Sequence, residues 1–455
     1  MKTSTQIGAA VAFAMAAAAA NAAPLTYAQL TTATAVYASG SSAFQTSLEK
    51  QLITIGGSTL TKYKDSADGK SFLAYAFTVV NPGTDLASIA NTNIILYYRV
   101  KGGSVWGPGP IAKNIATATL ALPTSAACGA SQTTMTSAPN GPANVCTIGS
   151  YTLNTDGPNP VSGLQYHLPD WGLSDVNPKA LSGENWVDAT SGAGALGVSA
   201  PTYSNITATT VQMLGQTFSV VINKNGPAGA VSSLRKQDLT AIFSGSAGDW
   251  SQLGDPVTRA PFGTGAITVC RRDPGSGTQT TVSSFFNAAG CSPASYAFVA
   301  STSTFPTISG VTQNNSTGNM LDCVNNNSGA IGFAVLDSGQ TQMTNNGGNV
   351  KVIGYDDVTP SKTNAANGSY QLYAEASSTI RPSLGAGTEK TFISGIQARL
   401  QDVSTFTAAD SLVGIPNLAG AASNTATLPI TVVSGNPVAI GTTGGNICAP
   451  LQNQD

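Results

Sequence analysis

The residues best suited to chemistry lie at 269–281, where two adjacent arginines, the second of them Arg272, precede Ser276 between two glycines. The apolar run 266–270 predicts a strand before them, and the apolar spacing at 278–287 predicts a helix after them. Backbone N–H groups at a helix N-terminus point at one spot, and the helix dipole adds partial positive charge there. The stretch therefore predicts a site for a small, tetrahedral anion. The alternative is an ordinary strand-to-helix turn in an α/β domain.

Two turns in the chain have the sequence of a helix N-cap. Ser276 and Gln279 have the spacing of a capping box, in which the serine caps the helix and the glutamine bonds back to the cap. The segment 35–52 repeats the succession of strand, Gly-Ser turn and helix, with Ser42 and Gln45 at the same spacing. Two such turns can face one ligand from opposite sides, although capping boxes are also common as purely structural features.

The first 22 residues have the pattern of a secretory signal peptide: Lys2, an apolar run at 8–20 and a small-residue motif that ends at Ala22. We expect cleavage after Ala22. The apolar run is too short to span a membrane, and no later run reaches about 18 continuous apolar residues. The residue directly after the cleavage position is not a cysteine, so a bacterial lipid anchor is not expected. The sequence predicts a periplasmic or secreted protein.

Charged residues are sparse: they make up only 9% of the 455 residues, and the formal net charge is −2. Loss of Lys2 with the signal peptide changes it to −3, which argues against general binding to nucleic acid. An anion site must then act locally, because no basic surface attracts the ligand. The length is sufficient for about two or three domains.

Six cysteines follow the signal peptide, an even number that predicts up to three disulfides in an exported protein. Cys128 and Cys146 flank a polar loop and are the simplest pair to propose. The other four allow three pairings, among which the sequence does not decide. No cysteine has C-x-x-C or Cys/His metal spacing, so we expect no zinc site and no cofactor. The four are Cys270, Cys291, Cys323 and Cys448.

Strand-like and helix-like segments alternate along the chain, which indicates an α/β fold. The segment 107–163 is rich in Pro, Gly, Ser and Thr, and we interpret it as a surface insertion. The run 216–224 predicts a strand that crosses into a second domain, and the runs 351–355 and 368–374 lead the chain back. His167 is the only histidine and lies in no nucleophile motif, so a structural role is favoured over that of a catalytic base.

Four segments, in order, resemble the periplasmic phosphate-binding proteins, which are the receptors of phosphate ABC importers. Residues 271–278, Arg-Arg-Asp-Pro-Gly-Ser-Gly-Thr, look like the Arg-x-x-x-Ser-Gly-Thr motif of that family. Residues 172–175 resemble its Gly-Ala-Ser-Asp, residues 238–250 its IF-x-G…W segment, and residues 329–333 its Gly-Ala-Ile-Gly-Tyr strand. Gly-Ser-Ser at 40–42 stands where the family has its first binding loop.

The resemblance implies a type II periplasmic binding protein, in which two α/β lobes are joined by crossing strands and hold the anion in a cleft between them. The expected division is residues 1–22 as signal peptide and 23–215 as lobe 1, with the insertion at about 107–163. Residues 216–355 would form lobe 2. Residues 356–455 would return to lobe 1 and add a C-terminal extension.

The resemblance also implies eight phosphate-binding residues. The motif around Arg272 would bind phosphate oxygens from one lobe, and Asp175 would accept the proton of a protonated phosphate from the other. Sulfate offers such a carboxylate only lone pairs, and this repulsion in a dry cleft should cost several kcal/mol, so sulfate would be rejected. The eight residues are Ser42, Phe44, Ser104, Asp175, Arg272, Ser276, Gly277 and Thr278.

The chain departs from the family pattern at two positions near this site. Ala43 stands where the family usually has a hydroxyl residue, just before Phe44. Pro274 stands where an acid often braces the arginine, and Asp273 has moved one place. The first departure removes one hydroxyl donor, and the second moves the acid that holds the arginine in place.

These observations predict an exported solute-binding protein that binds inorganic phosphate or a similar oxyanion for ABC-type uptake and is not an enzyme. We expect a monomer whose partner is the membrane complex of an ABC importer, with no role for nucleic acid. Two other classes stay open: a secreted phosphatase-like relative of the same fold, and an extracellular adhesive or matrix protein that reuses the fold. The phosphatase would need a nucleophile or a metal, while the low charge and the insertion favour the matrix protein.

Overall fold

The computed structural model describes most of the chain between residues 23 and 401, and beyond them five strands of two residues each. The predicted signal peptide, most of the predicted insertion and most of the C-terminal extension lie outside the described residues. The described residues are 23–65, 69–121, 132–133, 144–148, 164–186, 196–197, 199–255, 258–287, 308–314, 316–336, 348–366, 368–401, 412–413, 432–433, 436–437, 441–442 and 452–453.

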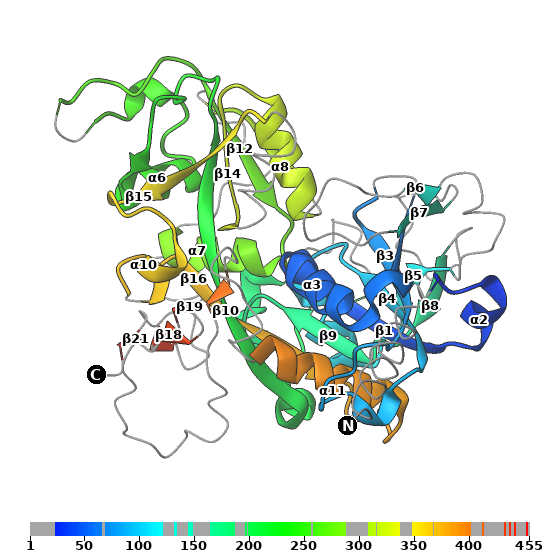
Figure 1. The fold of residues 1–455 in the computed structure, drawn as a ribbon. Helices are drawn as coiled ribbons and strands as arrows, with labels where there is room; N and C mark the ends of the chain where they lie inside the picture. The colour runs from blue at the N-terminus through cyan, green and yellow to red at the C-terminus, as the bar shows by residue number, and fades with distance from the viewer. Residues whose placement is uncertain are drawn as a thin grey trace, which may run out of the picture.

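The fold is α/β, as predicted, and its described strands include one sheet of 15 strands that divides into two lobes (Figure 1). The strands of lobe 1 are β1 (Thr34–Gly40), β2 (Thr61–Asp65), β3 (Phe72–Thr78), β4 (Asn93–Arg99), β6 (Gln132–Thr133), β7 (Asn144–Ile148) and β9 (Trp171–Ser174). Those of lobe 2 are β11 (Ser233–Leu234), β12 (Ile267–Arg272), β13 (Ile308–Asn314), β14 (Ala330–Val335) and β15 (Val350–Tyr355). The spatial order in lobe 1 is β9-β1-β4-β3-β2-β7-β6, and β12 lies between β13 and β14 in lobe 2.

Helices cover the sheet in both lobes. The described helices of lobe 1 are α2 (Tyr27–Thr32), α3 (Gln45–Gly56), α4 (Pro108–Lys113) and α11 (Thr388–Gln401). Those of lobe 2 are α6 (Lys236–Phe243), α7 (Gly277–Asn287) and α8 (Thr317–Asn326), and α10 (Lys362–Ala366) follows β15. None of the described helices is long and apolar enough to cross a membrane.

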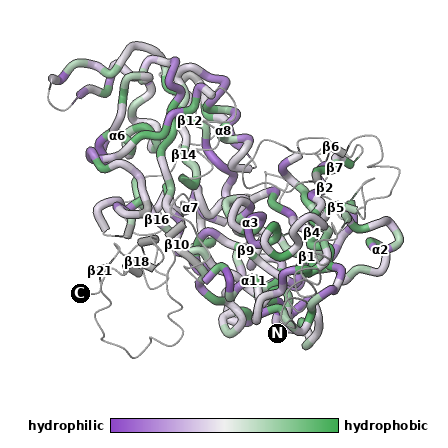
Figure 2. The backbone as a smooth tube through the Cα atoms, viewed as in Figure 1, coloured by the Kyte–Doolittle hydropathy of each residue, from purple (hydrophilic) through white to green (hydrophobic). Residues whose placement is uncertain are grey.

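The lobe 1 sheet is buried on both faces because alternate residues of its strands point to opposite sides. In β3, Leu73 and Tyr75 belong to the apolar cluster that α3 and α11 cover. Phe72 and Ala74 belong to a second cluster on the other face, together with Leu30 of α2. This explains why β3 is buried at every position from Phe72 to Phe77. Figure 2 also shows hydrophobic stretches, in green, near β12 and β14 of lobe 2.

Lobe 2 also has a sheet that is covered on both faces. Ile331 and Phe333 of β14 pack into the cluster that contains residues of α6 and α7. Ala330 and Ala334 point the other way, toward Met320 and its neighbours on α8. Helix α8 therefore covers one face of the lobe 2 sheet, while α6 and α7 cover the other.

One long strand, β10 (Thr210–Asn223), joins the lobes, as the predicted crossing requires. Its first part, up to Thr217, pairs with β16 (Tyr373–Ile380), and from Phe218 onward it pairs with β14 and then β15. Strand β16 also pairs with β9, so it returns the chain to lobe 1. The return predicted for 351–355 was wrong, because β15 pairs with β10 and β11 within lobe 2. The residue boundaries expected for the lobes stay a prediction.

The predicted insertion begins too early. Residues 108–113 form α4, whose Ile111 lies in an apolar cluster. Strand β5 (Thr117–Leu120) pairs with β8 (Leu164–His167) and buries Ala118 in the core. The richness in Pro, Gly and Thr that predicted a loop does not prevent these short elements, because their few apolar side chains are enough to dock them on lobe 1.

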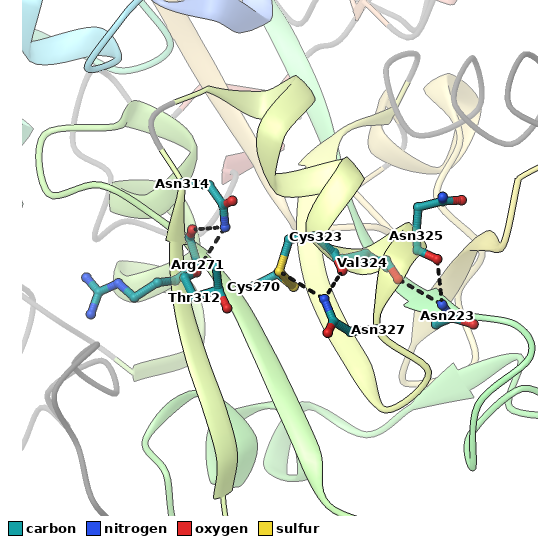
Figure 3. The surroundings of a disulfide bond; sticks show 9 residues. All are labelled: Asn223, Cys270, Arg271, Thr312, Asn314, Cys323, Val324, Asn325 and Asn327. Atoms are coloured by element: carbon teal, nitrogen blue, oxygen red, sulfur yellow. Dashed lines mark hydrogen bonds between the residues drawn. A yellow bond between two sulfur atoms is a disulfide. The ribbon is translucent and has the colours of Figure 1, made fainter. Parts of the chain in front are cut away.

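A disulfide joins Cys270 of β12 to Cys323 of α8, with 6.0 Å between the Cα atoms (Figure 3). This bond belongs to one of the three ways in which the sequence allowed the four cysteines to pair, and it fixes α8 against the sheet. Cys146 is also in a disulfide, but Cys128 lies outside the described residues, so the pairing of these two stays a prediction.

Candidate anion-binding site

The Arg-Ser-Gly-Thr residues lie where β12 ends and α7 begins, as the sequence predicted. Gly275 makes the turn with φ of 84°, a left-handed conformation that favours glycine. The Oγ atom of Ser276 accepts the N–H of Gln279 at 3.3 Å, so Ser276 caps the new helix. Residues 273–276 thus form a short turn between the arginine that ends β12 and the first N–H groups of α7.

The side chain of Gln279 does not complete the predicted capping box. Its Oε1 atom accepts the backbone N–H of Arg272 at 3.1 Å, and its Nε2 atom donates to Ser283 Oγ at 2.9 Å. The prediction was wrong because β12 lies close enough to offer a buried N–H that needs a partner. Gln279 therefore fixes the end of β12 relative to α7.

Three loops of lobe 1 face this turn. Strand β1 pairs in parallel with both β4 and β9, so the residues that follow these strands meet at one edge of the sheet. Ser41 follows β1, Ser104 follows β4, and Asp175 follows β9. The carboxyl ends of strands are the usual place for ligands in open α/β sheets.

The Asp175 carboxylate lies at the meeting point of the two lobes and is 2% exposed. Its Oδ1 atom accepts a hydrogen bond from Ser41 Oγ, and its Oδ2 atom accepts one from Thr278 Oγ1 at 3.1 Å. The backbone N–H of Asp175 donates to Ser104 Oγ at 3.0 Å. Burial raises the pKa of the Asp175 carboxyl, while the Ser41 hydrogen bond, the charge of Arg272 and the other hydrogen bonds lower it.

Glycines allow the two lobes to touch here. The N–H of Val105 donates to the carbonyl oxygen of Gly275 at 2.8 Å. A Cβ atom on Gly277 would lie 2.4 Å from Ser104 Oγ and 2.7 Å from Asp175 Cβ, closer than real Cβ contacts allow. The glycine of the Ser-Gly-Thr segment is thus required by the approach of lobe 1.

The Arg272 guanidinium is 1% exposed and points toward α8, on the same side of β12 as Cys270 two residues earlier. Its Nε atom donates to the carbonyl oxygen of Asn314 at 3.2 Å, and Nη1 donates to Thr317 Oγ1 at 2.8 Å. Burial lowers the pKa of Arg272, and the nearby charges of Asp273 and Asp175 raise it. Asp273 thus acts through its charge, while a carbonyl and a hydroxyl hold the guanidinium.

Ser42 is not the N-cap that the capping-box spacing predicted. The cap of the 3₁₀ turn Ser42–Phe44 is Ser41, whose Oγ accepts the N–H two residues later at 3.0 Å. The hydroxyl of Ser42 points to lobe 2, where it lies 3.0 Å from Thr317 Oγ1. The 3₁₀ turn thus moves the cap one residue earlier, to Ser41, and α3 itself begins only at Gln45.

Phe44 is placed differently from the polar residues. Its ring is fully buried in the apolar cluster of lobe 1, with Leu48 and Leu52 of α3. A contact between Phe44 and a ligand would therefore use its backbone. The other seven predicted site residues lie at the interface between the lobes.

Three residues of this interface were missed from the sequence: Ser41, Tyr98 and Thr317. The Tyr98 hydroxyl donates to the carbonyl oxygen of Ser41 and so supports the first loop. Burial, and then the charge of Asp175, raise the pKa of Tyr98 well above its ordinary value, so it remains a neutral donor. The Gly-Ser-Ser turn has two hydroxyls in the sequence, and the structure shows that both form hydrogen bonds at the interface, that of Ser41 with Asp175 and that of Ser42 with Thr317.

The single histidine lies away from these contacts. The His167 ring stacks on Tyr37, with 3.8 Å between the ring centroids, and its residue pairs with Thr117 in the two-stranded sheet of β5 and β8. Burial lowers the pKa of His167. Within the described part of the chain, no group of three His, Cys, Asp or Glu side chains could hold a metal ion.

A protein-family comparison matches residues 187–394 to the model of the PBP superfamily domain. This part of the chain includes the crossing strand, all of lobe 2 and the return to lobe 1. A comparison with curated proteins finds no match.

A comparison with solved structures matches phosphate-binding proteins at low identity. A putative phosphate ABC transporter substrate-binding protein from Clostridium perfringens, with bound phosphate, is 14% identical, with 82% of this chain and 94% of that chain covered and a TM-score of 0.41. An ABC-type phosphate transport receptor from Vibrio cholerae is 16% identical, with 81% and 94% covered and a TM-score of 0.38. A phosphate-binding protein from Stenotrophomonas maltophilia is 16% identical, with 81% and 84% covered and a TM-score of 0.42.

Proposed function

We propose that this chain, in which residues 187–394 match the PBP superfamily domain, is an exported receptor that binds inorganic phosphate between its two lobes. The observation that supports this most is a buried carboxylate, Asp175, and a buried guanidinium, Arg272, near the N-terminus of α7, close enough for the charge of each to shift the pKa of the other. A site with both a strong donor and a strong acceptor suits an anion that still carries a proton.

Each polar group has a part in this proposal. The planar fork of Arg272 donates two N–H bonds to anion oxygens, and the N–H groups of Gly277 and Thr278 add donors at the positive end of α7. The hydroxyls of Ser104 and Ser276 supply further contacts. The groups on each lobe are held in place by the fold of that lobe, which reduces the entropic cost of binding.

Asp175 determines which oxyanion is accepted. An ionised carboxylate has about four lone-pair positions, and Ser41 and Thr278 use two of them. A protonated phosphate can donate its O–H to another. Fully ionised sulfate has no proton to donate, so it would place its oxygens against a buried carboxylate and should be rejected.

The cellular role is also part of the proposal. The predicted signal peptide places the protein in the periplasm or outside the cell, and an ABC importer complex is the partner that would take up the released phosphate. The low net charge of the chain fits a receptor that recognises its ligand by local contacts. A monomer would suffice, because both halves of the site come from one chain.

Calorimetry tests the proposal. The mature protein is unfolded in denaturant with its disulfides intact, dialysed to remove any phosphate, refolded and titrated with phosphate. We expect saturable binding of about one phosphate per chain, as one interlobe site requires. Absence of binding by correctly refolded protein would overturn the proposal. Release of phosphate from a chromogenic ester would instead support the phosphatase-like class.

The variant Gly277→Ala should bind phosphate more weakly. Its Cβ would clash with Ser104 and Asp175 and keep the lobes apart. Overpacking of this kind costs about 1–3 kcal/mol, or about 5- to 150-fold in affinity. A phosphate titration measures the effect. Gly310→Ala is the matched control, because nothing lies within 4 Å of its added Cβ. Equal affinity of both variants would show that close contact at Gly277 is not needed.

The variant Asp175→Asn should lose selectivity. Loss of a hydrogen bond to a charged group weakens phosphate binding by about 1.5–3 kcal/mol, while sulfate no longer meets a negative charge. We therefore expect sulfate to compete with phosphate in this variant and not in the wild type. The exposed Asp357→Asn is the matched control and should retain selectivity. A variant that still rejects sulfate would assign selectivity to other groups.

The raised pKa of Asp175 predicts a pH dependence of the same selectivity. As the pH falls through this raised value, above the ordinary 3.8, Asp175 gains a proton and can donate to sulfate. Sulfate competition should thus increase toward acid in the wild type, with no such change in Asp175→Asn. In the absence of ligand, the raised pKa also makes the folded protein more stable as the pH falls through it, because the folded state binds the proton more tightly.

A further inference from the structure

Helix α8 brings a residue, Thr317, to the proposed phosphate site. This residue belongs neither to the Arg-Ser-Gly-Thr motif nor to the loops of lobe 1. Thr317 is the first residue of α8, is 4% exposed and lies between the two lobes. Ser316, the residue before it, caps the helix by accepting the N–H of Asn319 at 3.1 Å. The hydroxyl of Thr317 is therefore used for contacts outside its own helix.

Thr317 connects the arginine of lobe 2 to the first loop of lobe 1. Its Oγ1 atom accepts Nη1–H of Arg272 at 2.8 Å and lies 3.0 Å from Ser42 Oγ. Its backbone N–H also donates to Ser42 Oγ at 3.4 Å. One hydroxyl thus contacts both the main donor to the anion and the opposite lobe.

The position of Thr317 is fixed from two sides. The disulfide between Cys270 and Cys323 joins α8 to β12, and Asn314 at the end of β13 donates to the carbonyl oxygen of Arg271 at 3.1 Å (Figure 3). Farther along α8, Asp322 forms an ion pair with Lys70 of lobe 1. Helix α8 is therefore attached to the strand that ends in the arginine and also touches the other lobe.

We propose that Thr317 is a positioning residue for phosphate binding: its hydroxyl orients the Arg272 guanidinium and bonds to Ser42 when the lobes meet around the ligand. This inference rests on the proposed phosphate site. The charge of Asp273 acts on the guanidinium, while the Asn314 carbonyl oxygen and the Thr317 hydroxyl set its orientation through hydrogen bonds. Because the Ser42 contact joins the lobes, it stabilises the closed complex and slows release of the ligand.

The test compares Thr317→Val, which keeps the shape of the side chain and loses the hydroxyl, with Thr317→Ser, which keeps the hydroxyl. Association and dissociation of phosphate are measured by stopped-flow with tryptophan fluorescence. We expect Thr317→Val to raise the dissociation rate about tenfold or more, as for a lost hydrogen bond to a charged group. The association rate should stay within about threefold, and Thr317→Ser should restore most of the slow release.

Two further measurements separate positioning from a general structural role. Thr312→Val, at an exposed position of β13, is the matched control and should leave both rates unchanged. The double variant with Ser42→Ala should release phosphate more slowly than the product of the two single effects predicts, because both remove the same contact. Melting temperatures of the ligand-free variants should stay close to that of the wild type.

The outcomes distinguish this inference from the proposed function. If the refolded wild type does not bind phosphate, the phosphate site itself is wrong. If the wild type binds and Thr317→Val releases phosphate at the wild-type rate, the role of Thr317 is overturned and the site stands. Failure of Thr317→Ser to restore slow release, or full additivity with Ser42→Ala, overturns the role as well.

Discussion

Replacing Arg272 with alanine is expected to reduce the affinity for phosphate by about 30-fold to several thousand-fold. Truncating one partner of a buried, hydrogen-bonded charge pair costs about 2–5 kcal/mol, and each 1.4 kcal/mol is about tenfold. The cost should lie toward the upper end, because the guanidinium is 1% exposed and Asp175 would then stand alone against the anion. A calorimetric titration of the variant measures the loss.

Two variants serve as controls for this experiment. Arg271→Ala removes the same charge one residue earlier, but that side chain points to the opposite side of β12, away from the disulfide (Figure 3). It should bind phosphate within a few-fold of the wild type. Arg272→Lys keeps the charge and loses the planar fork, so it should recover only part of the affinity. If Arg272→Ala bound as tightly as Arg271→Ala, the arginine would not belong to the site.

The second large effect should appear in stability. The double variant Cys270→Ser/Cys323→Ser lacks the cross-link between residues 53 positions apart. In the wild type this cross-link reduces the number of conformations open to the unfolded chain. In the chain-entropy model, a loop of this length contributes about 4 kcal/mol to the free energy of unfolding. Denaturant unfolding of the variant and the wild type measures the difference, and we expect the midpoint to fall strongly.

The same variant probes the link between stability and binding. Helix α8 carries Thr317 and contacts lobe 1, so loosening its attachment to β12 should also speed the release of phosphate. An unchanged free energy of unfolding would show that packing of Met320 and its neighbours on β14 holds α8 without the disulfide. The wild type treated with a reductant under the same conditions gives an independent comparison.

The sequence predicted best those features that are set by local patterns. The strand at 267–272, its glycine turn and the capped α7 follow from side chains within about 20 residues, each with a propensity for the observed conformation. The second part of β10 was also predicted, at 216–224, because its apolar run is continuous and β-prone, whereas residues 210–215 were not. Local agreement between pattern and structure is common where packing and propensity favour the same conformation.

The sequence failed where the outcome depends on contacts between distant segments. Ser42 and Gln45 fit a capping box, but the structure caps the turn with Ser41, and Ser42 meets Thr317 some 275 residues away. Gln279 likewise bonds to Arg272 on the neighbouring strand. Asn314 and Thr317 were not singled out at all, because a lone hydroxyl or amide in a polar segment has no distinctive spacing. Pairing of β13 with β12 places Asn314 beside the arginine, and packing of α8 against β12 brings Thr317 there.

The central claim is a site that selects phosphate because phosphate carries a proton. Its most direct test is equilibrium dialysis of labelled phosphate against the refolded mature protein at neutral pH, with sulfate in large excess. We predict that each chain retains about one phosphate and that sulfate does not displace it, because Asp175 accepts a proton that only phosphate carries. Failure to retain phosphate, or its displacement by sulfate, would contradict the assignment of Asp175 and Arg272 to a phosphate site.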